Sequence, residues 1–166
     1  MKQRRNFLSA VALALLAAAL PASAAEDIVI GQVAPFSGPQ AVTGKAIHAG
    51  AKLCFDAVNA RGGVRGRAIR LVTRDDAQKP EESVRLTREL ISAEAPLALI
   101  GTVGTANLEA LAKDGVLTQQ RVSMIGAVSG AASVVQASGM HIVKASYHDE
   151  VARLFSQLAG AGCKMP

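Results

Sequence analysis

Aromatic residues are scarce in this sequence, which argues against one class of partner. They make up 3% of the 166 residues, with no tryptophan and a single tyrosine, Tyr147. Proteins that bind single-stranded nucleic acid stack the bases on aromatic side chains that lie among basic ones. The arginines between residues 61 and 74 have no aromatic residue among them. We therefore expect these arginines to form a solvated surface, and we expect no nucleic acid partner.

Cysteine is equally rare, which argues against structural metal sites and redox motifs. The two cysteines, Cys54 and Cys163, are too far apart to form a CxxC pair. Cys54 falls on the apolar side of a predicted helix, so we expect a buried thiol. The histidines at positions 48, 141 and 148 show no metal-ligand spacing. The sequence therefore predicts neither a metal nor a cofactor.

The motifs of common enzyme classes are missing as well. Residues 38–45 resemble a phosphate-binding loop, but five residues separate the glycines where that motif has four, and Ala46 replaces its Ser/Thr. Ser129 lies in the sequence GAVSG, which is not the GxSxG turn of a hydrolase. Asp75 and Asp76 lack a third acid, so we expect them to accept hydrogen bonds in a turn or helix cap. We therefore predict that the protein is not an enzyme.

The N-terminus has the pattern of an export signal. A basic head at residues 2–5 precedes an apolar run at 7–20, and a small-x-small cleavage site follows at 22–24. The apolar run is shorter than the roughly 20 residues that span a bilayer. We expect residues 1–24 to be a signal peptide that directs the chain to the periplasm. The paired arginines of the head also fit a twin-arginine motif, so the general secretory and twin-arginine routes both stay open.

After the signal, strand-like and helix-like segments alternate. Strands are expected at 28–34, 68–74, 97–100, 122–125 and 141–145, and helices at 45–60, from residue 80, at 105–113 and at 149–158. This alternation predicts an α/β fold with an open, mostly parallel, doubly wound sheet that has helices on both faces. Apolar and charged residues alternate within 68–74, which favours a half-exposed strand near a sheet edge.

Ligands of such sheets bind in the crevice beyond the carboxyl ends of the strands. The loop 101–105, GTVGT, follows one predicted strand and begins a helix. Backbone N–H groups at that helix start, with the hydroxyls of Thr102 and Thr105, are suited to a carboxylate. The loop 126–130 offers a second such surface, with Ser129 as the hydroxyl donor. The alternative is that Thr105 only caps its helix.

Several pieces in this order resemble a known family. They are Pro35–Pro39, Gly50–Arg67, Asp75–Asp76, Gly101–Thr105 and Ala145–Glu150. Behind an export signal, they resemble the start of a type I periplasmic solute-binding protein of ABC transporters, of the leucine/isoleucine/valine-binding group. The resemblance implies that residues 25–158 form the N-terminal lobe of a periplasmic binding protein-like I fold. It also implies a small-molecule ligand, an amino acid or similar small carboxylate, and an ABC permease as partner in the inner membrane.

The resemblance also implies which residues bind the ligand. In the family the first lobe holds the ligand's α-carboxylate and amino group. The matching groups here are the backbone of Val128 and Gly130 and the hydroxyl of Thr105 or Ser129. Thr43 matches a position that can be aromatic in amino-acid binders, and its small size argues against a branched-chain ligand. We expect Tyr147, near the crossover between lobes, to line the cleft.

The end of the sequence departs from the family pattern. Family members continue into another strand and a second lobe, whereas residues 159–166 read as a divergent tail, AGAGCKMP. We therefore expect a truncated form without the second lobe, which binds on the order of millimolar or more weakly. A ligand-sensing or regulatory module of the same fold, similar to an amide sensor, is the alternative; it predicts a signalling partner instead of a permease.

Overall fold

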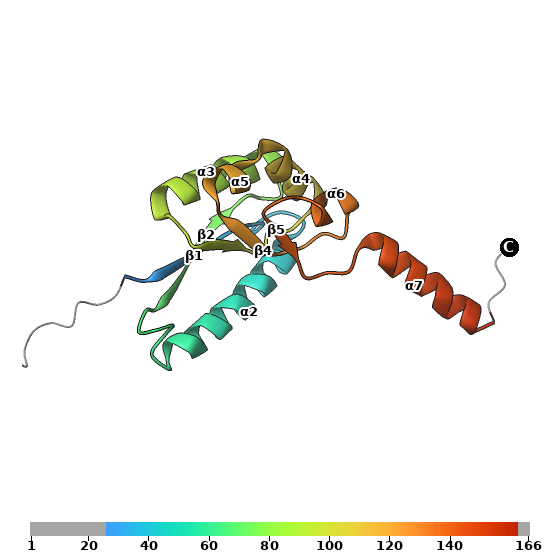
Figure 1. Cartoon of the computed structure of the whole chain (residues 1–166), viewed down its shortest axis with the longest axis horizontal. Coiled ribbons are helices and arrows are strands. Elements are labelled where there is room, and N and C mark those ends of the chain that lie inside the picture. Colours follow the sequence, from blue (N-terminus) through green and yellow to red (C-terminus); the bar gives the residue numbers. More distant parts are fainter. Residues whose placement is uncertain (1–25, 163–166) are drawn as a thin grey trace, which may run out of the picture.

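The computed structural model describes residues 26–162, in which five parallel strands form a single sheet (Figure 1). The predicted signal peptide lies outside the described residues. The strands follow the order β2-β1-β3-β4-β5. Their bounds are β1 Ile28–Ala34, β2 Ile69–Asp75, β3 Ala98–Ile100, β4 Ser123–Ala127 and β5 Met140–Ile142. The prediction of an open parallel sheet is confirmed.

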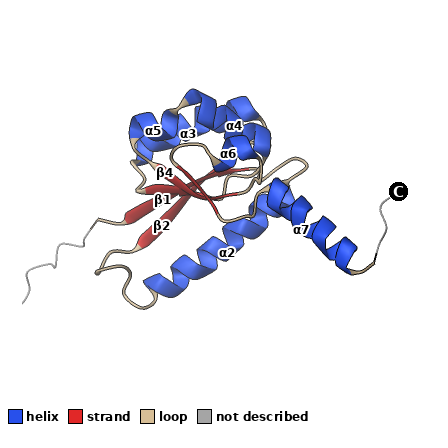
Figure 2. Cartoon of the chain, turned by 45° about the vertical axis from the view of Figure 1, so that its right-hand side comes forward, coloured by secondary structure: helices blue, strands red, loops and turns tan. Residues whose placement is uncertain are grey.

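Helices lie on both faces of the sheet, as a doubly wound fold requires (Figure 2). The helix α2 lies on one face, and α3, α4, α5 and α6 lie on the other. Their bounds are α2 Ala41–Asn59, α3 Pro80–Glu94, α4 Thr105–Asp114, α5 Val116–Gln120 and α6 Ala132–Val135. The last described helix, α7 Tyr147–Gly160, points away from the sheet (Figure 1).

The hydrophobic core lies between the sheet and the layer of α3 to α6. Its fully buried members include Leu90, Leu99, Leu108, Leu111, Met124 and Val134. The burial of each such side chain stabilises the folded state by about 1.5–3 kcal/mol. Gly31 in β1 leaves space for this packing, because a Cβ at this position would lie 2.5 Å from a methyl carbon of Leu90 and 2.6 Å from one of Leu99.

The strand β2 lies at an edge of the sheet, as the alternating pattern of its residues predicts. It pairs only with β1 in the described part of the chain, in register from Ile28↔Ile69 to Ala34↔Asp75. Polar residues are tolerated on an edge strand because water reaches its backbone and side chains. Arg70 uses this exposure to form an ion pair with Glu94 at 3.0 Å.

Several helix boundaries differ from the sequence-based expectation. The helix α2 begins at Ala41, so the predicted loop up to Gly44 is wrong for its last four residues. Gly44 suggested a loop, but it serves as a close-contact position within the helix: a Cβ there would collide with the carbonyl oxygen of Pro35. The short helices α5 and α6 were not predicted, because five and four residues are too few to show a helical period.

The expectation of a buried Cys54 is wrong. Cys54 is a free cysteine on the exposed side of α2. The helix contacts the sheet through a narrow stripe that includes Gly44, Ile47, Ala51 and Phe55, whereas Cys54 lies to one side of this stripe. The apolar pattern of α2 is broader than the stripe that the sheet covers, which is why the sequence favoured burial.

The helix α7 contributes nothing to the core of the described residues. None of its residues is buried, and its apolar side chains are 41–54% exposed; these are Val151, Leu154, Phe155 and Leu158. The strands and helices up to β5 therefore form the packed layer structure. The assignment of residues 25–158 to one lobe stays a prediction.

Two glycines of α2 lead to opposite predictions for the same substitution. Gly44→Ala should lower the free energy of unfolding by about 1–3 kcal/mol, because the new methyl group meets backbone that cannot move aside. Gly50→Ala should raise it by about 0.5–1 kcal/mol, because nothing lies within 4 Å of the added Cβ and alanine favours the helix. Urea denaturation followed by circular dichroism measures both. Equal effects of the two substitutions would contradict the close contact at Gly44.

Candidate functional site

Two hydroxyl groups meet where β3 and β4 end. Thr105 is the first residue of α4, after β3, and Ser129 follows β4. Their Oγ atoms lie 2.9 Å apart and share a hydrogen bond. The neighbouring strands align the two loops, because the parallel pairing continues past their ends as a bridge between Val103 and Val128. The sequence assigned hydroxyl donors to both loops, and the sheet order brings them together.

The start of α4 has no side-chain cap. Its N-cap is Gly104, with φ of 107°, and no side chain accepts a hydrogen bond from the first turn. The alternative that Thr105 only caps its helix is therefore wrong, since Thr105 is the first helical residue and its hydroxyl contacts Ser129. The first N–H groups of a helix have no partner within the helix, and they carry partial positive charge. The donor surface consists of these groups and the two hydroxyls.

Tyr147 at the start of α7 lies against the same loop. Its N–H donates to the carbonyl of Gly130 over 2.8 Å. A Cβ at Gly130 would lie 2.7 Å from Tyr147 Cδ1 and 2.7 Å from the carbonyl oxygen of Ala145, so only glycine permits this approach. The ammonium group of Lys144 lies 5.0 Å from the centre of the Tyr147 ring, within range of a cation–π contact.

The pKa of Tyr147 responds to the groups of this site. Its hydrogen bonds with the side chains of Thr105 and Ser129, and then with the backbone of Gly130, lower the pKa of Tyr147 below its ordinary value. Burial opposes this shift, and the nearby positive charge of Lys144 adds to it. The hydrogen bonds and the charge of Lys144 stabilise negative charge on an oxygen at this position, whereas burial disfavours it. The site is therefore suited to an anionic oxygen.

The remaining predicted site residues have other places in the structure. Thr102 is fully buried, and its hydroxyl donates to the carbonyl of Val33 over 2.7 Å, which fixes the loop to β1. The N–H of Val128 donates to Thr102 over 2.9 Å and is thus used in the bridge between the loops. Thr43 lies in the first turn of α2, where its hydroxyl donates to Gln40 over 3.1 Å. A role for any of these residues in ligand binding stays a prediction.

A buried polar cluster supports the loops from below, and the sequence did not predict it. Asp76 is fully buried; its carboxylate accepts a hydrogen bond from Ser83 over 2.5 Å and another from Asn107 over 3.3 Å. Asn107 also donates to Ser83 over 2.7 Å. The one available signal was the position of Asn107, which lies on the buried side of α4 beside Leu108 and therefore needs a partner.

Asp75, by contrast, holds the loop after β1. Its Oδ1 accepts hydrogen bonds from the N–H groups of Phe36 at 2.8 Å, Ser37 at 3.2 Å and Ala77 at 2.9 Å. Burial raises the pKa of Asp75, but the hydrogen bonds from the Ser37 side chain and from the backbone outweigh it and leave the pKa below its ordinary value. The predicted role of the two aspartates as turn acceptors is confirmed.

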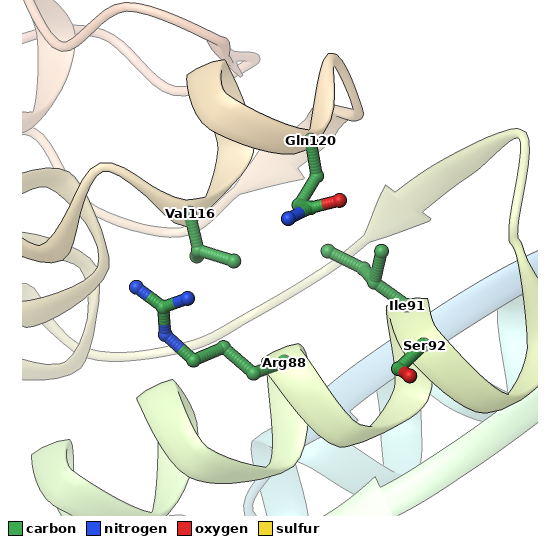
Figure 3. A pocket seen from close by; sticks show the side chains of 5 residues that line it. All are labelled: Arg88, Ile91, Ser92, Val116 and Gln120. Atoms are coloured by element: carbon green, nitrogen blue, oxygen red, sulfur yellow. The ribbon is translucent and has the colours of Figure 1, made fainter.

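A surface crevice in the helix layer does not suggest a ligand site. A crevice of about 320 Å³ lies between α3 and α5 (Figure 3) and is lined by Arg88, Ile91, Ser92, Val116 and Gln120. The guanidinium of Arg88 is paired with Asp114 at 2.8 Å, so its charge is already neutralised. No group of three potential metal ligands occurs in residues 26–162. Over the same residues, no helix has the length and apolar character to cross a membrane.

Comparison with known proteins identifies the family. Residues 27–164 match the family described as periplasmic binding protein. The chain belongs to this family. Leu/Ile/Val-binding protein homolog 7 of Brucella suis biovar 1 (strain 1330) is 35% identical over 75% of this chain and 31% of its own length. The chain thus spans about a third of the length of this curated relative.

Solved structures agree with this assignment. A substrate-binding periplasmic protein from Ralstonia solanacearum has 45% sequence identity and a TM-score of 0.78, over 82% of this chain and 38% of that one. A solute binding protein of an ABC transporter from Rhodopseudomonas palustris BisB5, in complex with 3,4-dihydroxy benzoic acid, has 25% identity and a TM-score of 0.72. That match covers 84% of this chain and 37% of the neighbour. The resemblance to a type I periplasmic binding protein of the leucine/isoleucine/valine-binding group is therefore confirmed.

The lowered pKa of Asp75 leads to a prediction about stability and pH. A carboxylate with a depressed pKa stabilises the folded chain above its unfolded pKa, and this contribution is lost as the pH falls through the folded pKa. Asp75→Asn should therefore lower the free energy of unfolding near pH 7, and its difference from wild type should shrink in acid.

Urea unfolding between about pH 7 and pH 3 measures this difference. Asp56→Asn is the control, because Asp56 forms only an exposed pair with Lys52, which is worth about 0–1 kcal/mol. A penalty for Asp75→Asn that stays constant with pH would contradict the predicted shift.

Proposed function

We propose that this chain forms the carboxylate-binding half of an extracytoplasmic substrate-binding protein of an ABC transporter. The ligand class is amino acids or similar small carboxylates. We further propose that residues 1–24 direct export to the periplasm, that residues 25–158 belong to the first lobe, and that an ABC permease of the inner membrane receives the ligand. The site binds its ligand and performs no chemical step on it.

The cluster of hydroxyls from Thr105 and Ser129 beside Gly130 supports this proposal most directly. Ser129 is fully buried, and its Oγ lies within hydrogen-bond distance of both Thr105 and the N–H of Ala131. Hydrogen bonds from such groups to an ionised oxygen are roughly twice as strong as those between neutral groups. No carboxylate side chain of the described residues is hydrogen-bonded to this cluster, so no fixed negative charge there competes with an anionic ligand.

The names of similar proteins agree with a carboxylate. One relative is named a Leu/Ile/Val-binding protein homolog, and one structural neighbour holds 3,4-dihydroxy benzoic acid. Amino acids and benzoic acids differ in size and shape, but they share the carboxylate. A site that recognises mainly this group is compatible with either ligand. We also propose that Thr43 borders the ligand, since a small side chain at this position is compatible with ligands of different shapes.

The same fold also serves ligand-sensing and regulatory modules, which is the second candidate function. The exposed apolar side of α7 is compatible with docking to a signalling protein as well as with a transporter component. The two functions share the ligand site and differ in the partner. Co-purification with permease components supports transport, whereas co-purification with a kinase or transcriptional regulator supports sensing.

Titration of the isotope-labelled chain with L-leucine and with benzoate tests the ligand class. Amide resonances of Thr105, Ser129 and Gly130 should shift on addition of either carboxylate. The double substitution Thr105→Val with Ser129→Ala should weaken binding at least about tenfold, since each hydrogen bond to a charged group is worth about 1.5–3 kcal/mol.

The double substitution Thr118→Val with Ser133→Ala is the matched control. It makes the same chemical changes at exposed positions whose hydroxyls bond to Gly115 and Glu109 instead. Its affinity for both carboxylates should equal that of wild type. Binding that survives the loss of both Thr105 and Ser129 hydroxyls would place the ligand elsewhere and refute the proposed site.

A further inference from the structure

We propose that Gln78 is a further ligand-contacting residue that determines specificity: its side-chain carbonyl accepts a hydrogen bond from an amino group of the ligand. This inference rests on the proposed function, because it assumes that the ligand carboxylate binds at Thr105 and Ser129. It adds that the site prefers amino acids over carboxylates of the same shape that lack an amino group.

The loop after β2 places Gln78 beside the start of α4. A Cβ at Gly104, the N-cap of α4, would lie 2.6 Å from Nε2 of Gln78. Glycine at position 104 therefore leaves the space that the side-chain amide of Gln78 fills. The next residue is Thr105, whose hydroxyl is hydrogen-bonded with that of Ser129. The amide of Gln78 thus lies next to the proposed carboxylate site.

The backbone of this loop has an unusual conformation that fixes the position of Gln78. Ala77 and Gln78 have φ of 47° and 64°, in the left-handed region that residues other than glycine rarely adopt. The carboxylate of Asp75 accepts a hydrogen bond from the N–H of Ala77 over 2.9 Å, and that of Asp76 accepts one from the N–H of Gln78 over 3.0 Å. Such a conformation persists only where the surrounding contacts impose it. The two aspartates therefore fix the point from which the side chain of Gln78 extends.

The Oε1 atom of Gln78 is a buried acceptor without a partner. Among residues 26–162, no donor is hydrogen-bonded to it. Buried polar atoms of folded proteins nearly always have a hydrogen-bond partner, because an unpaired one is unfavourable. The residue as a whole is half-buried, and no hydrogen bond holds the oxygen in place. A turn about the last side-chain bond can therefore present this oxygen to a ligand.

An amino group of the ligand is the donor that this acceptor suits. An ammonium group has hydrogens to donate and cannot accept, so it needs acceptors around it. The hydroxyls of Thr105 and Ser129 and the first N–H groups of α4 offer donors, which suit the carboxylate of an amino acid. The carbonyl of Gln78 offers an acceptor beside them. Because the ammonium is charged, its hydrogen bond is stronger than one between neutral groups.

The substitution Gln78→Met tests the inference, because methionine has a similar length and lacks the carbonyl. L-leucine and 4-methylpentanoate are the two probes, since they share a carbon skeleton and a carboxylate and differ in the amino group. Titrations followed through the amide resonances of Thr105 and Ser129 give both affinities. We expect the affinity for L-leucine to fall at least about tenfold and that for 4-methylpentanoate to stay unchanged.

The substitution Gln119→Met is the matched control. It removes an amide that also lies beside a glycine, Gly115, but that donates to the carbonyl of Asp114 over 3.1 Å, away from the proposed site. Both affinities should equal those of wild type. If Gln78→Met weakens both probes equally, Gln78 only supports the loop, and if it weakens neither, Gln78 does not contact the ligand. Either result overturns the inference.

The substitution Gln78→Glu is a second test that keeps the shape of the side chain. A carboxylate at this position attracts the ammonium of L-leucine and repels the carboxylate that both probes share. The preference for L-leucine over 4-methylpentanoate should therefore increase, and an unchanged or smaller preference contradicts the inference. If both probes bind wild type and neither substitution of Gln78 changes their ratio, the inference is wrong and the proposed function stands. If neither probe binds wild type, the proposed function fails and this inference fails with it.

Discussion

The edge of the sheet that carries the proposed site depends on one buried carboxylate. Asp76 lies at the end of the edge strand β2, has no exposed surface, and is hydrogen-bonded to Ser83 of α3 and to Asn107 of α4. Its N–H also donates to Ala34 at the end of β1. A buried polar group without partners costs about 1–3 kcal/mol, and a charged one more, so this cluster tolerates few other arrangements. The cluster thereby fixes the position of α4 and, with it, the position of Thr105, the first residue of that helix.

From this support the site follows by geometry. The parallel pairing of β3 with β4 brings Thr105 beside Ser129, and glycine at position 130 lets Tyr147 approach the same point. The result is a donor-rich surface with the first residue of α7 held against it through Gly130. An open parallel sheet places ligands beyond the carboxyl ends of its strands, and this surface lies there.

Most of the fold was predictable because its signals are local. Apolar runs separated by helical patterns indicated the five strands and a parallel sheet. The polar residues of β2 indicated that this strand lies at an edge. The short helices α5 and α6 were not predictable, since they have too few residues for a periodic pattern. The burial of Cys54 was predicted wrongly, because the pattern of one helix does not show how wide a stripe its sheet will cover.

By itself the sequence determined the class of fold, the family, and the loops that carry hydroxyl and glycine residues beyond the strands. Those features depend on residue type and on spacing along the chain. The tertiary structure decided which of these residues meet. Thr102 and Thr105 belong to one loop, yet the hydroxyl of Thr102 is bound to Val33 in the interior, whereas that of Thr105 faces Ser129. Likewise, only the path of the chain after β5 places Tyr147 against Gly130. Such contacts join residues that are far apart in the sequence. They depend on the order of the strands and on the direction of the backbone, which local sequence patterns do not show.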